Sequence, residues 1–341
     1  MFARKTRKIV SKFGSIAALE EVFLGGTKQF VLMRGENIEN PIMLFLHGGP
    51  GTAQIGFAPK FQRNLEKDFL VVNWDQKGAG ISYSPTLKKE EMTIESMLHD
   101  AVQLIKYLLK RFNQSKLFLV GHSWGTVLGT LTAQRFPQYI HSYIGIGQVA
   151  HMEKGEKISY EYTLNKAKEL KNEKAFKELT LLDYNPSDLN YLLVQRKWLS
   201  KFGGSAIGIT DYQLIYSNMF SANEYTFKDW FTYMKASRFS LESMWSQVLT
   251  IDFLKDPLQI EVPVYIFAGK QDYQTPTQLA NQYFDNLDCP HKGFILFEQS
   301  AHLPNFEEPQ KFYEECVKIK EKHTPLLDER VPKHKELVNT K

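Results

Sequence analysis

A serine nucleophile is indicated by residues 121–125, which read Gly-His-Ser-Trp-Gly. The apolar, strand-like run 116–120 precedes them, and the small-residue, helix-like run 126–136 follows. Between a strand and a helix, Gly-x-Ser-x-Gly forms a nucleophile elbow, a tight turn in which the glycines avoid clashes and the serine Oγ is exposed. The same letters also occur in ordinary Gly-rich turns, but here both flanking elements are legible. We therefore predict that Ser123 is a catalytic nucleophile.

The acid and the base that such a serine requires follow in the expected order along the chain. The strand-like run 262–268 is followed by Asp272, and the next run, 293–297, is followed by His302. In this architecture the triad members lie at the carboxyl ends of neighbouring strands, so these two residues occupy the required positions. We predict a triad of Ser123, His302 and Asp272. The alternative for Asp272 is a turn carboxylate that caps the helix beginning near Pro276.

An oxyanion hole is predicted from residues 47–51, which read His-Gly-Gly-Pro-Gly after the apolar run 43–46. Acyl transfer needs hydrogen-bond donors placed where the carbonyl oxygen becomes negative. A glycine-rich loop lets a backbone N–H approach that oxygen, and the N–H of the residue after the nucleophile adds a second donor. We assign these donors to Gly49 and Trp124. The loop lacks the Lys-Ser/Thr ending of a phosphate-binding P-loop, which is the alternative.

Together these segments resemble the prolyl aminopeptidase (proline iminopeptidase) branch of the α/β-hydrolases. The resemblance rests on residues 47–51, on residues 74–82 (Trp-Asp-Gln-Lys-Gly-Ala-Gly-Ile-Ser), on residues 121–125, on Asp272 and on His302, and it extends from about residue 19 to about residue 317. It implies a metal-free serine hydrolase that removes an N-terminal residue, often proline, from small peptides or related amides.

Two departures from that family pattern bear on function. Lys77 stands where the family usually has arginine, so a bidentate contact made there is lost. The family's tryptophan-glutamate element, whose glutamates receive the free amine of the substrate, is not found in the inserted region. The triad carries over from the resemblance, whereas the site that binds the amine does not.

Composition is typical of a globular protein and argues against a nucleic-acid-binding, secreted or membrane-spanning protein. Of its 341 residues, 43% are hydrophobic, which is ample for a core. The net charge is +4, but five of the 42 basic residues lie in the first twelve positions, so the rest is nearly neutral and shows no nucleic-acid footprint. The basic N-terminus lacks the apolar region of a signal peptide, and no run reaches the length of a membrane span, so we expect a cytoplasmic protein. Cys289 and Cys316 match no disulfide framework or metal spacing, and we expect no metal or other cofactor.

The elements that must position these residues alternate between strands and helices. Residues 16–24 and 30–33 suggest an N-terminal hairpin, and later strands alternate with helices, as in a mostly parallel sheet covered on both faces. We predict an α/β-hydrolase core in residues 1–150 and 255–320, interrupted by a helical cap in residues 151–254 and followed by a charged extension in residues 321–341. We expect the many aromatic residues of the cap to form its core and some of them to line the substrate pocket.

The leading hypothesis is an aminopeptidase of the prolyl type acting on a small-molecule or short-peptide substrate. A carboxylate would recognise the free amine, and because the triad face has none to spare, it must come from the cap. Glu161, Glu224 and Glu242 are the candidates because each adjoins aromatic or apolar cap residues; the alternative for each is a solvated helix carboxylate. The second hypothesis is an esterase, a lactonase or another small-amide hydrolase with the same triad. The third is a catalytically silent binding module.

Overall fold

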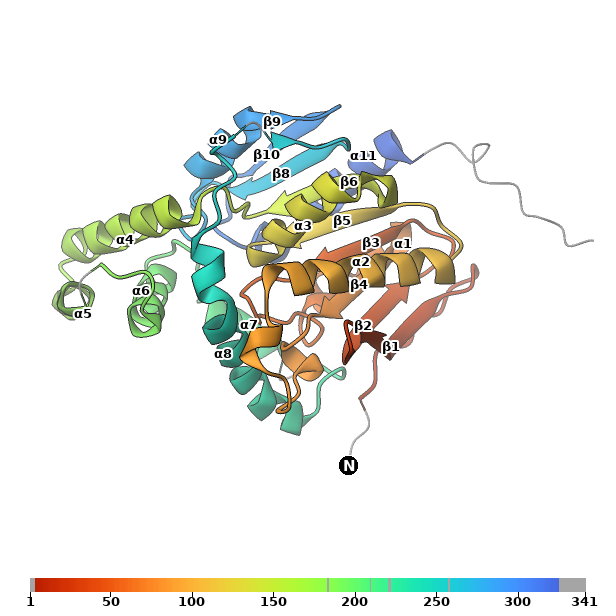
Figure 1. Ribbon diagram of the computed structural model, residues 1–341, viewed down its shortest axis with the longest axis horizontal. Helices are drawn as coiled ribbons and strands as arrows, with labels where there is room; N and C mark the ends of the chain where they lie inside the picture. Colours follow the sequence, from red (N-terminus) through yellow and green to blue (C-terminus); the bar gives the residue numbers. More distant parts are fainter. Residues whose placement is uncertain (1–3, 183, 209, 220–221, 257, 325–341) are drawn as a thin grey trace, which may run out of the picture.

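The computed structural model describes residues 4–182, 184–208, 210–219, 222–256 and 258–324 (Figure 1). The strands are β1 (Ile16–Leu24), β2 (Thr27–Gly35), β3 (Ile42–Leu46), β4 (Leu70–Asp75), β5 (Leu117–His122), β6 (Ile140–Ile146), β7 (Leu258–Gln259), β8 (Val264–Gly269), β9 (Leu287–Asp288) and β10 (Lys292–Phe297). The helices are α1 (Leu65–Asp68), α2 (Ile94–Arg111), α3 (Trp124–Arg135), α4 (Met152–Glu169), α5 (Glu173–Leu181), α6 (Leu189–Lys201), α7 (Asp211–Met219), α8 (Phe227–Leu249), α9 (Thr277–Asn286), α10 (Pro304–Glu307) and α11 (Pro309–His323). Short 3₁₀ turns are η1 (Ala58–Lys60), η2 (Gly80–Ser82), η3 (Lys89–Glu91) and η4 (Pro137–Tyr139).

The main sheet has the strand order β1-β2-β4-β3-β5-β6-β8-β10. The hairpin of β1 and β2 is antiparallel and β2 is antiparallel to β4, whereas every other neighbouring pair is parallel. Because parallel strands share one carboxyl edge, β5, β8 and β10 end at the same side of the sheet. This arrangement confirms the predicted α/β-hydrolase fold class.

Alternating side chains on the central strands explain why helices cover both faces of the sheet. In β3, Leu44 packs into one apolar cluster and Phe45 into another, and the same alternation repeats in β4, β5 and β8. Strands buried on both sides are typical of parallel sheets. Residues of α2, α3 and α9 complete the first cluster, and residues of α1 and α11 complete the second, so the sheet forms the middle of three layers (Figure 1).

Helices α4 to α8 occupy the segment between β6 and β8 that the sequence assigns to a cap. Helices α4, α5 and α6 pack against one another and project away from the sheet, and α8 lies beside η2, η3 and α2 (Figure 1). Among the described residues, no helix is both long and apolar enough to cross a membrane. Helix α11 continues to His323, beyond the predicted start of the charged extension, and residues 325–341 of that extension lie outside the described residues.

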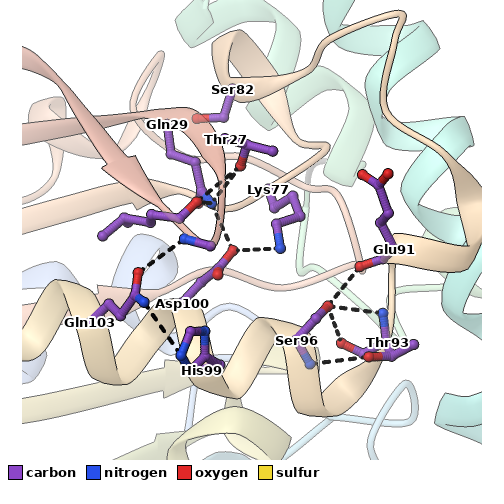
Figure 2. Close-up of polar contacts among 12 residues, drawn as sticks. Thr27, Gln29, Lys77, Ser82, Glu91, Thr93, Ser96, His99, Asp100 and Gln103 are labelled. Atoms are coloured by element: carbon purple, nitrogen blue, oxygen red, sulfur yellow. Dashed lines mark hydrogen bonds and ion pairs between the residues drawn. The ribbon is translucent and has the colours of Figure 1, made fainter.

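A buried ion pair joins the loop after β4 to helix α2. The Lys77 Nζ lies 2.9 Å from the Asp100 Oδ2, and the two side chains are 5% and 0% exposed. Gln29 of β2 donates to the same oxygen at 2.7 Å and accepts from the Trp74 indole N–H at 2.9 Å. Figure 2 shows Gln29 and Lys77 reaching Asp100 of α2 from β2 and from the loop after β4. Lysine thus meets the carboxylate through one ammonium contact, whereas an arginine can offer a bidentate fork.

Candidate active site

Ser123 occupies a strained turn between β5 and α3. Its φ of 54° and ψ of −121° lie in a region that residues other than glycine rarely adopt. The turn is possible because the residues two positions before and after Ser123 are glycines. A Cβ on Gly125 would lie 2.0 Å from the Leu46 carbonyl oxygen, and a Cβ on Gly121 would lie 2.5 Å from the Gly125 carbonyl oxygen. The close approach of β3, β5 and α3 therefore requires both glycines and forms the predicted elbow.

Asp272 and His302 meet at the ends of the adjacent parallel strands β8 and β10. The His302 Nδ1 lies 2.9 Å from the Asp272 Oδ2, and the two side chains are 2% and 1% exposed. The other carboxylate oxygen, Oδ1, accepts the backbone N–H groups of Gln274 and Thr275, both at 2.9 Å, and the Thr275 hydroxyl donates to Oδ2 at 2.9 Å. Since a carboxylate only accepts, the histidine proton is held on Nδ1. The Nε2 therefore carries the lone pair that a general base needs.

One large cavity brings the nucleophile and the base together. Ser123 and His302 both line this space of about 740 Å³, which lies beneath the cap helices. The His302 Nε2 is buried and has no hydrogen-bond partner among the described residues. A base with an unoccupied lone pair in the same cavity as a serine is what nucleophilic acyl transfer needs. No group of three or more potential metal-ligating side chains occurs among the described residues.

The predicted oxyanion loop also lines this cavity. Gly49 and Trp124 are both lining residues, and Gly49 has a φ of 116°, which favours glycine. The loop is held by His47, whose Nδ1 donates to the Gly48 carbonyl at 2.9 Å while its Nε2 accepts the Gln76 N–H at 3.1 Å. Burial lowers the pKa of His47 to about 4, so its ring stays neutral and can play both roles. His47 thus positions the loop.

Comparison with known proteins identifies the family of the chain. A family model described as the alpha/beta hydrolase fold matches residues 41–309. The chain belongs to the α/β-hydrolase family. A Bacillus subtilis (strain 168) protein named probable aminopeptidase YbaC is 34% identical over 301 residues, which cover 87% of this chain and 94% of that protein. A proline iminopeptidase of Clostridium botulinum is 24% identical over 277 residues, covering 81% of this chain and 88% of that protein.

The same fold is found in solved structures. The crystal structure of a proline iminopeptidase from Mycobacterium smegmatis has a TM-score of 0.67 at 17% identity, over 90% of this chain and 98% of that one. At this identity the likeness shows the fold alone. Together with the relatives, it confirms the resemblance predicted from the sequence motifs.

The three glutamates predicted to bind an amine do not line the cavity of this α/β-hydrolase. Glu161 is exposed on α4. Glu224 is buried but accepts the Thr6 hydroxyl at 2.7 Å, and Glu242 is paired with Lys89 and with Arg238 of its own helix. None of the three is among the described residues that line the cavity, so the structure does not bring them to the triad.

A different carboxylate, which sequence reasoning missed, does line the cavity. Glu156 of α4 is the one acidic residue among the described lining residues, and its side chain is 1% exposed. Its Oε1 accepts from the Arg196 guanidinium of α6, which lines the cavity as well. Its Oε2 is buried without a hydrogen-bond partner among the described residues. The cap therefore presents a buried carboxylate that arginine holds in place and that has one oxygen unused.

Proposed function

We propose that this α/β-hydrolase is a serine aminopeptidase that releases N-terminal residues, including proline, from short peptides. Its relatives are named probable aminopeptidase and proline iminopeptidase, which supports this substrate class. The observation that carries the proposal is the buried carboxylate of Glu156 in the same cavity as Ser123 and His302. An exopeptidase must distinguish a free amine from a peptide nitrogen, and a desolvated carboxylate does so through a charge-assisted hydrogen bond.

The proposed mechanism is a two-step acyl transfer. The His302 Nε2 takes the proton of the Ser123 hydroxyl as its Oγ attacks the scissile carbonyl, and the N–H groups of Gly49 and Trp124 bind the resulting oxyanion. Asp272 orients the imidazole through Nδ1 and stabilises its positive charge. His302 then protonates the departing amine, and a water molecule, deprotonated by the same histidine, hydrolyses the acyl-enzyme. No step in this scheme uses a cofactor.

The rest of the cavity suits a small apolar residue followed by a short chain. Its volume of about 740 Å³ exceeds the space that one amino acid fills. Its wall is largely apolar, as in most small-molecule sites, and includes Leu192, Leu214, Leu241, Trp245 and Val248. These side chains can surround a proline ring, while Glu156 binds the imino group through Oε2.

A turnover panel tests this proposal. The arylamides of proline, alanine and leucine would be compared with their N-acetylated forms and with short-chain esters that lack an amine. We expect strong preference for the free-amine arylamides. Glu156→Gln should raise KM for these substrates about 10- to 100-fold, because a hydrogen bond to a charged group is lost, and should leave the esters nearly unchanged.

The matched control is Glu161→Gln, which removes an exposed carboxylate from the same helix and should change neither class of substrate. Equal turnover of free and blocked substrates by the wild-type enzyme would refute the aminopeptidase assignment. Turnover of esters alone would favour an esterase.

A further inference from the structure

A second polar group in the cavity wall has an unused hydrogen-bonding atom. Gln54 follows the glycine-rich loop, lines the cavity and is 3% exposed. Its backbone carbonyl accepts the N–H of Ala58 at 2.9 Å, which fixes the chain at this point. Its side-chain Oε1 is buried and has no hydrogen-bond partner among the described residues. Proteins leave few buried acceptors without a donor, so this oxygen suggests a donor on the ligand.

The orientation of the Gln54 amide is determined by its neighbour His122. The His122 Nε2 lies 3.0 Å from the backbone carbonyl oxygen of His302, and because a carbonyl only accepts, Nε2 carries the proton. Burial lowers the pKa of His122 to about 3, so the ring is neutral and its Nδ1 is an acceptor. The Gln54 Nε2 lies 3.2 Å from that Nδ1 and donates to it. Turning the amide over would oppose two acceptors, so the orientation of the amide is fixed and Oε1 stays an acceptor.

The same contacts place Gln54 near His302, the proposed base. Gln54 is linked through His122 to the backbone of His302, the residue that protonates the leaving group in the proposed mechanism. Leu303, the residue after His302, lines the cavity, and so does Phe57, three residues after Gln54. This wall therefore lies beside the base and next to the oxyanion loop.

We infer that Gln54 is a specificity-determining residue whose Oε1 accepts the N–H of the scissile amide during acylation, so that the enzyme favours amides over esters. The inference rests on the proposed acyl transfer. When the Ser123 Oγ bonds to the carbonyl carbon, the amide nitrogen becomes pyramidal. Its lone pair must face the His302 Nε2 to take the proton, which turns the N–H toward another wall. The C–N bond then breaks, and the amine leaves with the proton from His302.

An ester cannot make this contact, because its leaving oxygen carries no hydrogen. A site built to accept a hydrogen bond discriminates against an analogue that lacks the donor, since the buried acceptor then stays unpaired. The contact strengthens as the nitrogen turns, so it should act on the acylation transition state and appear in kcat/KM.

The test compares alanine anilide with alanine phenyl ester, which share the acyl group and differ only in N–H against O. In Gln54→Met, which keeps the side-chain length but removes both polar atoms, kcat/KM for the anilide should fall about 10- to 100-fold relative to the ester. Alanine N-methylanilide, an amide without N–H, should be a poor substrate of the wild type and should be insensitive to the substitution. Asn190→Leu is the matched control, because it removes another side-chain amide from the cavity lining and should leave the anilide-to-ester ratio unchanged.

Three outcomes decide between the ideas. An anilide-to-ester ratio that stays within twofold of wild type in Gln54→Met, or a parallel loss on both substrates, overturns the role of Gln54 while leaving the aminopeptidase proposal intact. Equal turnover of N-acetylated and free anilides overturns the aminopeptidase proposal. The role of Gln54 is then tested with the anilide-to-ester ratio of the N-acetylated anilide and the N-acetylated phenyl ester. Selective loss on the anilide supports the inference.

Discussion

Replacing Asp272 with asparagine tests the proposed triad most directly. The Asp272 Oδ1 accepts two backbone N–H groups, so an asparagine at this position keeps its carbonyl oxygen there and turns its NH₂ toward His302. That NH₂ donates to the His302 Nδ1, which drives the imidazole proton to Nε2. The resulting tautomer has no lone pair for the Ser123 hydroxyl. The geometry therefore predicts loss of the base while the carboxamide keeps the shape of the site.

The size of the loss follows from the groups exchanged. Restoring the active tautomer would put the proton back on the His302 Nδ1. The hydrogen bond from the asparagine NH₂ to this nitrogen would then be lost, and two buried N–H donors would face each other, at about 1–3 kcal/mol for each unsatisfied group. A total of roughly 3–6 kcal/mol corresponds to a fall in kcat/KM of about 10²- to 10⁴-fold, and the upper end equals the known effect of this change in a serine protease. Steady-state kinetics on a free-amine arylamide would measure it, with Asp252→Asn as a control outside the cavity lining. A loss below tenfold in a folded Asp272→Asn enzyme would refute the assignment of Asp272.

Three further outcomes are expected. Ser123→Ala should abolish both turnover and labelling by a fluorophosphonate while the protein stays folded, and labelling of the alanine variant at another serine would contradict the nucleophile. Lys77→Met should lower the free energy of unfolding by about 3–5 kcal/mol, because the buried Asp100 carboxylate then has no counter-charge, and adding Asp100→Asn should recover most of the loss in urea titrations. Burial raises the pKa of Asp75 from 3.8 to about 7. Between these pH values the folded state keeps a proton that the unfolded state has released, so stability should fall as pH rises, and Asp75→Asn should flatten that slope. An unchanged slope in Asp75→Asn would contradict the raised pKa of Asp75.

The fold and the proposed triad were accessible from the sequence because each depends on local signals. The elbow needs only a strand, two glycines and a helix in succession, and the acid and the base follow strands that parallel pairing must bring to one edge. Asp272 and His302 lie 30 residues apart in sequence, yet the sheet order places β8 beside β10. Strand order in this fold is regular enough that positions after successive strands predict proximity.

The amine-binding glutamates were misplaced because neighbours in a helical sequence do not share a face. Glu161 lies between Tyr160 and Tyr162 in sequence, but successive helical residues point about 100° apart. Tyr160 packs against Tyr191 with ring centroids 5.7 Å apart, and Tyr162 stacks on Tyr273 at 3.7 Å, which leaves Glu161 exposed.

The sequence around Glu156 gives no indication that this residue is buried. It lies in a stretch rich in lysine and glutamate that is typical of a solvated helix, and its burial depends on Arg196, 40 residues away in α6. Packing between α4 and α6 therefore decides that Glu156 lines the cavity and Glu161 does not. The order of residues along α4 does not indicate this difference.

Glu156 and Gln54 are alike in their hydrogen bonding, and in the proposed scheme both act on substrate choice and not on the chemistry at Ser123. Each is a buried polar side chain whose first atom is held by a protein partner, Arg196 or His122, and whose second atom has no partner among the described residues. Holding one atom fixes the direction of the other, so a ligand meets an oriented acceptor at little entropic cost. Neither side chain is hydrogen-bonded to Asp272, Ser123 or the His302 side chain among the described contacts. Substitutions at these two positions should therefore change which substrates are chosen, while the rate at which a small fluorophosphonate labels Ser123 stays close to that of the wild type.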